Sequence, residues 1–373
     1  MATYRSFTKI FFIVLNSVVA IIFLLACIAP YLNPKKWWLI SLIGLGFAFI
    51  IITLIAFILF WLVFKPRWML ISLVAIGIGY KSILVFFGFH ISDKFDYNKP
   101  QNVLRIAHWN VARFVEWKRN NNKGSQIRMK MMDQIKEQNA DVLCFQEFFT
   151  STDSVYYNNL DYIVKELGYP YYYFSYDNDG YLQWYGQAIF SKYPLLDTGL
   201  IRYPKPSLPE ALLHADIVFK GDTVRVYTTH LQSVQFQKKD YETIEDIKSN
   251  TNEENVKKSR GIFSKLKRGV INRSVQADIV RNEINKSPYP FVLTGDFNDV
   301  PNSYTYFTIK NNDLQDAFLM TGLGVGRTFV NIAPTLRIDY MLTTKNFAIK
   351  QFNRIIKNYS DHYMLVSDVE LKK

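Results

Sequence analysis

Long uncharged runs near the N-terminus are the feature that most constrains this fold. No Asp, Glu, Lys or Arg occurs within residues 10–34 or 37–64, and Lys81 is the only one within 68–91. A helix needs about 20 apolar residues to cross the roughly 30 Å of hydrocarbon in a bilayer. The alternative, a buried helical hairpin in a soluble protein, normally keeps a polar face that these runs lack. The sequence therefore predicts three transmembrane helices, near residues 10–30, 38–63 and 68–89.

The net charge of +12 is concentrated around these apolar runs. Residues 1–90 contain seven of the 44 basic residues and none of the 32 acidic residues. The rest of the chain is only mildly basic, so the overall charge is weak evidence for a nucleic-acid partner.

The positive charges of the connecting segments determine the direction of insertion only weakly, because the segments share these charges evenly. The short basic start before the first apolar run is typical of an insertion signal, which favours an N-terminus on the inside. Three crossings then predict an integral, multi-pass membrane protein whose catalytic domain is extracytoplasmic.

A linker at residues 92–102 precedes a domain at 103–373 in which strands and helices alternate. Apolar runs predict strands at 103–111, 140–147, 186–191, 336–342 and 362–371, a hairpin over 212–231, and helices at 125–139, 154–167 and after Pro301. This order predicts a layered α/β domain, with one sheet packed on another and helices outside. No disulfide is predicted, because Cys27 lies in a predicted membrane span and Cys144 lies in an apolar run of the second domain.

A charged segment at residues 235–275 interrupts the alternation. The favoured interpretation is a solvated insertion, since long charged loops are commonly functional or disordered. The alternative places Ile262, Phe263 and Leu266, which alternate with basic residues, on an anionic membrane surface or a polyanionic substrate.

Polar side chains follow several of the predicted strands. Each alone is typical of a turn or a cap, but together they form an ordered set. Carboxylate and amide oxygens, with no cysteine and few histidines, favour Mg²⁺ or Mn²⁺ over zinc, and so indicate phosphate chemistry. The set comprises Asn110, Glu147, His230, Asp296, Asn298, Asp339, Asp361 and His362.

The segments "WN", "QE", "THL", "GDFND", "RIDY" and "SDH", in this order, resemble the endonuclease/exonuclease/phosphatase superfamily, whose members share the DNase I-like fold. The resemblance covers about residues 103–371, and "GDFN" with the downstream "SDH" is its most specific part. It implies a four-layer sandwich of two mixed β-sheets flanked by helices. It also implies cleavage of phosphate esters with a divalent metal.

The same resemblance implies a metal site in which Glu147 is the principal ligand, Asn110 lies beside it and Asp361 lies near the ion. Mg²⁺ or Mn²⁺ would stabilise the charge that develops on a phosphoryl group during hydrolysis. For Arg337 the sequence leaves two interpretations open, a contact to the substrate phosphate and an ordinary surface arginine.

The resemblance implies catalytic roles for five further residues. Asp296 and Asn298 would orient the attacking water, and His230 would contact the scissile phosphate. Asp339 would hold His362 in the required tautomer. His362 would then act either as a general base or as an electrostatic anchor for the phosphate, and the sequence leaves both roles open.

We therefore expect a membrane-anchored phosphodiesterase or nuclease-like enzyme with water as the nucleophile. Members of the family act on DNA, RNA, inositol phosphates and sphingomyelin, and "TLRIDYM" and "DVPNSYTY" depart from the inositol-phosphatase and abasic-site branches. Nucleic acid and a phospholipid headgroup both remain possible substrates, and a sphingomyelinase-like phosphodiesterase or phosphatase that acts on lipid headgroups is the enzymatic alternative. A non-catalytic binding copy of the fold is the other alternative. Besides the lipid bilayer, no protein partner is inferred.

Overall fold

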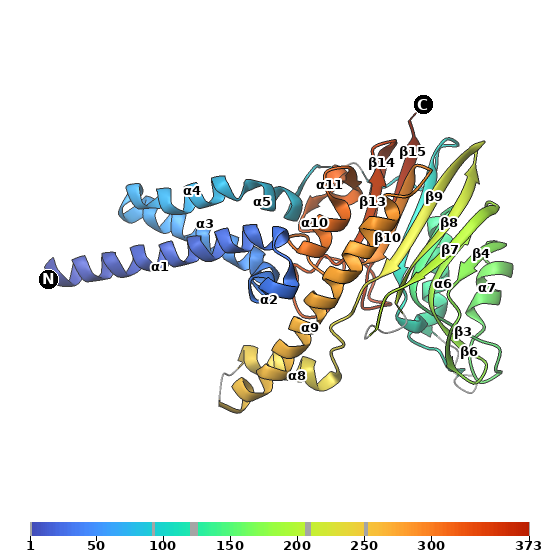
Figure 1. The fold of residues 1–373 in the computed structure, drawn as a ribbon, viewed down its shortest axis with the longest axis horizontal. Helices are drawn as coiled ribbons and strands as arrows, with labels where there is room; N and C mark the ends of the chain where they lie inside the picture. Colours follow the sequence, from blue (N-terminus) through green and yellow to red (C-terminus); the bar gives the residue numbers. More distant parts are fainter. Residues whose placement is uncertain (1, 92–93, 120–125, 206–209, 250–252, 373) are drawn as a thin grey trace. The chain divides into compact units, whose positions relative to one another are not determined.

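The computed structural model describes residues 2–91, 94–119, 126–205, 210–249 and 253–372, and the chain forms two compact units (Figure 1). The first unit contains residues 1–87, 236–274 and 299–308. The second contains residues 88–235, 275–298 and 309–373. The chain therefore returns to the first unit twice after leaving it. Part of the predicted linker at 92–102 lies outside the described residues.

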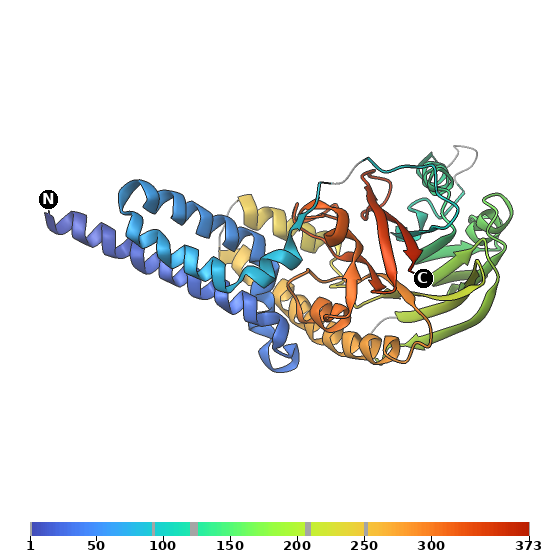
Figure 2. The ribbon, with the colours of Figure 1, turned by 90° about the horizontal axis from the view of Figure 1, so that it is seen from above.

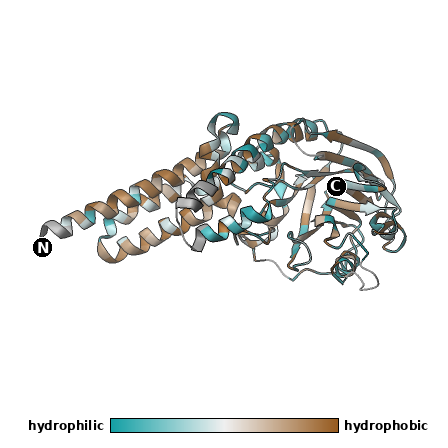
Figure 3. Cartoon of the chain, turned by 90° about the horizontal axis from the view of Figure 1, so that it is seen from below, coloured by the Kyte–Doolittle hydropathy of each residue, from teal (hydrophilic) through white to brown (hydrophobic). Residues whose placement is uncertain are grey.

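The N-terminal part of the first unit is helical and hydrophobic along most of its length (Figure 3). Two segments, Ser6–Tyr31 and Pro34–Phe64, are long and apolar enough to cross a membrane. The helices and 3₁₀ turns are α1 Ala2–Ile28, η1 Ala29–Tyr31, α2 Pro34–Ile43, η2 Gly44–Gly46, α3 Phe47–Phe64, η3 Pro66–Met69, α4 Leu70–Ile78 and α5 Tyr80–Phe86.

The third predicted span is bent. Pro66–Ile78 and Tyr80–Phe86 meet at 64°, so the protein has three candidate spans only if this pair counts as one. Gly79 lies at the break, where a Cβ atom would come within 2.4 Å of the Phe23 ring and 2.7 Å of Cys27 Sγ. Only glycine permits this close approach to α1, and glycine also weakens the helix at that point.

The charged segment expected as a solvated insertion forms two helices of the first unit. These are α8, Lys238–Ser249, and α9, Glu253–Ile284, whose last ten residues belong to the second unit. The residues after "GDFND" also belong to the first unit. The buried Asn302 amide donates to the Ala26 carbonyl oxygen (2.8 Å), and the Phe307 ring contacts the Tyr31 ring.

The second unit contains two large sheets and a two-stranded ladder of β1 Gly88–Phe89 with β12 Leu323–Gly324. One sheet has the order β11-β13-β10-β9-β8-β7, and the other has the order β14-β15-β2-β3-β6-β4, with β5 also paired to β6. Both sheets are mixed, because β10 runs parallel to β9 and β2 runs parallel to β3 while the other pairs are antiparallel. The strands are β2 Leu104–Asn110, β3 Val142–Ser151, β4 Tyr171–Phe174, β5 Asp177–Gly180, β6 Gln183–Ser191, β7 Leu195–Arg202, β8 Ala211–Phe219, β9 Asp222–His230, β10 Phe291–Asp296, β11 Leu314–Asp316, β13 Asp339–Thr344, β14 Phe347–Ile355 and β15 Met364–Leu371.

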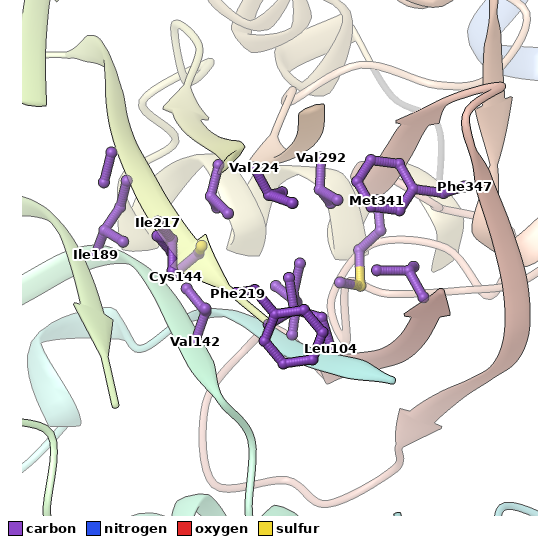
Figure 4. Close-up of a cluster of buried hydrophobic side chains, with 14 of the residues drawn as sticks. Leu104, Val142, Cys144, Ile189, Ile217, Phe219, Val224, Val292, Met341 and Phe347 are labelled. Atoms are coloured by element: carbon purple, nitrogen blue, oxygen red, sulfur yellow. The ribbon is translucent and has the colours of Figure 1, made fainter. Parts of the chain in front are cut away.

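Two buried clusters separate the layers of this unit. The first joins the inner faces of both sheets, with Val142 and Cys144 from one sheet near Val224 and Val292 from the other (Figure 4). The second joins the outer face of the seven-stranded sheet to helices α6, Gln126–Gln138, and α7, Asn159–Lys165. The short helical elements η4 Ala112–Phe114, α10 Tyr304–Lys310 and α11 Ala317–Thr321 complete the fold.

The predicted class, two mixed sheets flanked by helices, is confirmed (Figures 1 and 2). The central strand β2 is buried at every position, including the polar residues Arg105, His108 and Asn110. The predicted hairpin over 212–231 is β8 and β9, and its turn uses positive φ angles at Lys220 (55°) and Gly221 (89°).

Candidate active site

The strand register brings the predicted polar residues to one edge of the second unit. In the parallel ladders, Asn110 lies opposite Gln146 and Asp296 lies opposite His230. The antiparallel ladder of β10 with β13 also places Asp296 opposite Asp339. Asp296 therefore has a predicted site residue on each side, at the carboxyl end of its own strand.

Gly295 permits this close packing. A Cβ atom at position 295 would lie 2.6 Å from Thr229 Cγ2 and 2.7 Å from the Thr229 carbonyl oxygen. The glycine of "GDFND" therefore allows β10 to approach β9 closely at the residue preceding Asp296.

Glu147 reaches the same edge through an irregularity in β3. The pairing of β3 with β6 shifts register between Phe145 and Phe148, and Glu147 between them has a φ of 51°. A bulge of this kind redirects a side chain, and left-handed backbone in a residue other than glycine is typical of functional sites. Asn298, in the loop after β10, also has a positive φ (52°), and its amide donates to the Leu231 carbonyl oxygen (3.0 Å).

Four buried side chains form a line of alternating imidazoles and carboxylates. His362 Nδ1 lies 2.9 Å from Asp339 Oδ2, and His362 Nε2 lies 3.6 Å from Asp296 Oδ2. His230 Nε2 lies 3.5 Å from the same Asp296 oxygen. The backbone N–H of Asn298 donates to the other Asp296 oxygen (2.8 Å). The line therefore runs from Asp339 through His362 and Asp296 to His230.

The charges along this line follow from burial and pairing. Burial alone would lower the pKa of His362, but Asp339 and Asp296 raise it well above its ordinary value. Burial alone would raise the pKa of Asp339, but His362 and a hydrogen bond with His108 hold it well below its usual range. His362 is therefore an imidazolium at neutral pH, held against an ionised Asp339.

The other two members respond mainly to burial. Burial raises the pKa of Asp296 to about 6, although the neighbouring histidines oppose that shift. Burial lowers the pKa of His230, and the nearby His362 lowers it further against the opposing effect of Asp296. His230 is therefore neutral at pH 7, and Asp296 titrates close to physiological pH.

A second group of oxygen ligands lies next to this line. The Asn110 amide nitrogen donates to Asp296 Oδ2 (3.1 Å) and Glu147 Oε1 (3.4 Å). Burial, followed by the charge of Asp361, raises the pKa of Glu147, while His362, Asn110 and Arg113 oppose the rise. Two half-buried carboxylates that repel each other fit a divalent cation, which would lower the pKa of Glu147. The two carboxylates are hard oxygen donors, whereas the Asn110 amide oxygen accepts from the Ala112 backbone N–H (3.1 Å).

Asp296, Asp339 and His362 also present ligand atoms within 4.8 Å of one another, and all three are buried. Hydrogen bonding already explains that proximity, since His362 Nδ1 is bonded to Asp339 and its Nε2 faces Asp296. An imidazolium between two carboxylates has no free nitrogen lone pair for a metal. We therefore assign the fit for a cation to Glu147 and Asp361, with Asn110 beside them.

A small cavity of about 140 Å³ opens beside Glu147 and His230. The residues that line it include Tyr185, Gln187 and Glu210. Gln187 is 2% exposed, and neither atom of its amide has a hydrogen-bond partner in the described part of the chain. A substrate group entering this cavity therefore meets unused donors and acceptors.

The structure does not bring Arg337 to this group. Its side chain is 1% exposed, and its guanidinium donates to Asp316 (2.7 Å) and lies over the Phe318 and Tyr340 rings. Arg337 is thus engaged inside the protein, away from the expected phosphate contact. The other eight predicted residues lie along one edge.

Sequence reasoning missed His108 and Ser360. His108 Nε2 lies 3.2 Å from Asp339 Oδ1, an oxygen that also lies 3.1 Å from His362 Nδ1. Its signal was its position two residues before Asn110, which places both side chains on the same face of β2. The Ser360 hydroxyl donates to the Asn110 carbonyl oxygen (2.8 Å) and accepts from the His362 backbone N–H (3.2 Å). Ser360 is the first residue of "SDH" and joins two parts of the site.

Comparisons with known proteins agree with this arrangement. The sequence model of the Endonuclease/Exonuclease/phosphatase family matches residues 107–362, which include all nine predicted site residues. A domain of unknown function matches residues 8–86. No functionally curated protein matches the chain.

Two solved structures illustrate the similarity in fold. An endonuclease/exonuclease/phosphatase from Beutenbergia cavernae DSM 12333 is 18% identical, with a TM-score of 0.51, and the match covers 73% of this chain and 72% of that protein. The human Nocturnin catalytic domain, solved with bound sulfate, is 17% identical with a TM-score of 0.51. That match covers 73% of this chain and 94% of the other.

Proposed function

This chain belongs to the endonuclease/exonuclease/phosphatase family and is a phosphoric ester hydrolase, and from that premise we propose that it is a membrane-anchored, divalent-metal-dependent phosphodiesterase. Water is the nucleophile, and the products are an alcohol and a phosphate monoester. The observation that carries the proposal is the buried line of Asp339, His362 and Asp296 beside the Glu147 carboxylate.

The residues of this line have different roles because they carry different charges. Asp296, with a pKa of about 6, accepts the proton of the attacking water, and Asn298 helps to fix the Asp296 carboxylate through its backbone N–H. His362 contacts a phosphoryl oxygen as a cation, held in place by Asp339. Neutral His230 completes the contact with the scissile phosphate.

In this proposal Glu147 and Asp361 would hold the metal, with Asn110 beside them. Mg²⁺ or Mn²⁺ supplies positive charge that stabilises the phosphoryl oxygens as negative charge develops on them. The mutual repulsion of Glu147 and Asp361 supports a cation at this position. Asn110 links the metal site to the general base, because its amide contacts both Glu147 and Asp296.

The substrate is a nucleic acid or a phospholipid headgroup. Gln187 lines the cavity beside Glu147, and neither atom of its amide has a hydrogen-bond partner among the described residues. This supports a substrate with a polar group next to the scissile phosphate. The apolar helices of the first unit favour the lipid headgroup as the second candidate, because they would hold the enzyme at its substrate. We place the catalytic unit outside the cytoplasm of a multi-pass protein.

The test uses the full-length protein in detergent with Mg²⁺ or Mn²⁺. Single-stranded DNA, duplex DNA, RNA, sphingomyelin and inositol phosphates are supplied as substrates, and product release is measured. We expect hydrolysis of one class, and His362→Ala should lower its rate by roughly 10²–10³-fold. His214→Ala is the matched control, because His214 is a partly buried histidine on β8 whose nearest carboxylate is Asp197 (3.6 Å), outside the site.

The outcomes separate the candidate functions. Hydrolysis of sphingomyelin alone selects the headgroup enzyme, and hydrolysis of DNA or RNA selects the nuclease. Binding of a phosphate ester with no turnover on any substrate would overturn the proposal and favour a binding protein.

A further inference from the structure

Basic and aromatic residues from two distant parts of the sequence gather within the first unit. Both parts lie outside the catalytic residues, and the proposed hydrolysis does not use them. We call this set the basic–aromatic cluster, and it comprises Lys35, Lys36, Trp37 and Trp38 of α2 with Arg260, Phe263, Lys267 and Arg268 of α9.

A cation–π contact joins the two halves of the cluster. Lys267 Nζ lies 4.6 Å from the centre of the Trp38 ring. Two further aromatic side chains are open to solvent, since Trp37 is 51% exposed and Phe263 is 52% exposed. The contact fixes the middle of α9 beside the first turns of α2.

The length of the second candidate span places Trp38 near the surface of a bilayer. Pro34–Phe64 contains 31 residues, which extend about 46 Å at 1.5 Å per residue. The hydrocarbon core is only about 30 Å thick, so one end must reach the headgroups. Basic residues stand at both ends, with Lys35 and Lys36 at the start of the span and Lys65 directly after it, so both ends reach the headgroups, where tryptophan is enriched. Lys267 and its neighbours on α9 are therefore held at headgroup level.

Most cations of the cluster have no ion-pair partner among the side chains that the structure describes. Residues 259–274 contain five basic residues and no acidic residue. Lys265 pairs with Asp240 of α8 (2.5 Å), and Arg273 pairs with Asp299 (3.2 Å). Within the described ranges, the other cations form no ion pair, although α8 carries further acidic residues. These unpaired cations are Lys35, Lys36, Arg260, Lys267 and Arg268.

We propose that the basic–aromatic cluster binds anionic phospholipid headgroups and holds α9 on the membrane surface. Five unpaired cations match the negative charge of anionic lipids, and basic residues near such a surface are attracted to it. The exposed Phe263 ring favours a membrane over a nucleic acid, because an apolar side chain next to cations is typical of interfacial helices. The inference depends on insertion of Pro34–Phe64 into a bilayer and is independent of the catalytic proposal.

A fluorescent label at position 263 tests the inference in the full-length protein. Phe263→Cys is made with Cys27→Ala, since the remaining Cys144 is buried, and the labelled protein is placed in nanodiscs. With phosphatidylglycerol present, we expect a blue-shifted emission that brominated lipid quenches. In phosphatidylcholine alone the quenching should fall several-fold. Tyr181→Cys is the control, because Tyr181 is 80% exposed on the second unit and should stay aqueous.

A charge reversal supplies the second measurement. Arg260→Glu with Arg268→Glu leaves the Lys267–Trp38 contact intact and should abolish the dependence on phosphatidylglycerol. Lys220→Glu with Lys357→Glu, two exposed lysines of the second unit, should leave it unchanged. Emission at position 263 that stays aqueous in anionic nanodiscs would overturn the inference. Protection of the label by an oligonucleotide but not by anionic lipid would also overturn it.

Discussion

His362 lies between two buried carboxylates, and its charge determines which proton transfers the site can perform. Asp339 and Asp296 keep the imidazole protonated above its ordinary pKa, so at neutral pH it has no free nitrogen to accept a proton. Asp296, with a pKa of about 6, is ionised at the same pH. This geometry supports our proposal of Asp296 as the base and His362 as the cationic contact, one of the two roles that the sequence leaves open for His362.

A bell-shaped pH profile of kcat/KM follows from these two groups. Protonation of Asp296 should lower the rate as the pH falls through about 6, and a bound metal would move this limb to lower pH. Deprotonation of His362 should lower the rate on the alkaline side, well above pH 6.5. Asp339→Asn removes a charge that stabilises the imidazolium, so the alkaline limb should move to lower pH. The measurement is hydrolysis by the full-length protein across this range.

Asp197→Asn serves as the control for that series, because Asp197 lies near a different histidine, His214. An alkaline limb that stays in place in Asp339→Asn would contradict the assignment of His362 as a cation. A limb that moves to higher pH would contradict it as well.

At the scale of residues, the sequence predicted most of the side chains that gather in the candidate site. The strand ends predicted eight polar residues that the sheets bring to one edge, because parallel ladders align their carboxyl ends. His108 was missed because its contact with Asp339 joins residues 231 positions apart. Arg337 was expected at the substrate, but its partner Asp316 is specified only by the packing of β11 against β13.

At the scale of helices and strands, Arg337 connects β11, β13 and α11. Its guanidinium precedes β13 and binds Asp316, which ends β11 and also caps α11 through the Phe318 backbone N–H (3.0 Å). Both side chains are 1% exposed. A buried pair of this kind orders the elements that it joins, and loss of one partner leaves an uncompensated charge.

Asp316→Ala should therefore destabilise the protein by about 3–5 kcal/mol while leaving kcat of the folded fraction close to the wild-type value. Chemical denaturation and hydrolysis measured on the same sample check both parts. Asp313→Ala is the matched control, because its pair with Arg281 is half exposed at the carboxylate and should contribute about 1 kcal/mol or less. A large rise in KM for Asp316→Ala, with unchanged stability, would instead place Arg337 at the substrate.

Element boundaries were predictable where burial is uniform and less so elsewhere. The run of β2 is buried throughout, so hydrophobicity alone located it. The charged residues 235–275 were expected to be solvated, whereas they form α8 and most of α9, because apolar positions such as Val270 are buried within the first unit. The bend at Gly79 was also missed, since hydropathy does not report the contact with Phe23.

At the scale of the whole molecule, the two units are interleaved along the chain. Residues 299–308 directly follow Asn298 of the candidate site, yet they belong to the unit that contains the apolar helices. Asn302 donates to the Ala26 carbonyl oxygen, and Phe307 contacts Tyr31. The boundary near residue 100, which the composition indicates, therefore does not separate two independent domains.

A fragment of residues 100–373 should be less stable than the full chain. Removal of the N-terminal helices leaves the buried Asn302 amide without its acceptor and exposes Phe307, so aggregation without detergent is expected. Size-exclusion chromatography and limited proteolysis, compared with the full-length protein, measure the effect. A monodisperse fragment that resists protease as well as the full chain would show that the catalytic unit folds independently.

The central claim is that Glu147 holds a divalent cation that the hydrolysis requires. The most direct test is the rate at which the full-length protein in detergent hydrolyses a simple phosphodiester with Mn²⁺, with EDTA and with Glu147→Gln. Glu370→Gln is the control, because Glu370 of β15 pairs with Lys350 of β14, outside the site. We predict that EDTA and Glu147→Gln each lower the rate by at least about 10²-fold while Glu370→Gln does not. Equal rates for the wild type and Glu147→Gln, or hydrolysis that EDTA does not slow, would contradict the account.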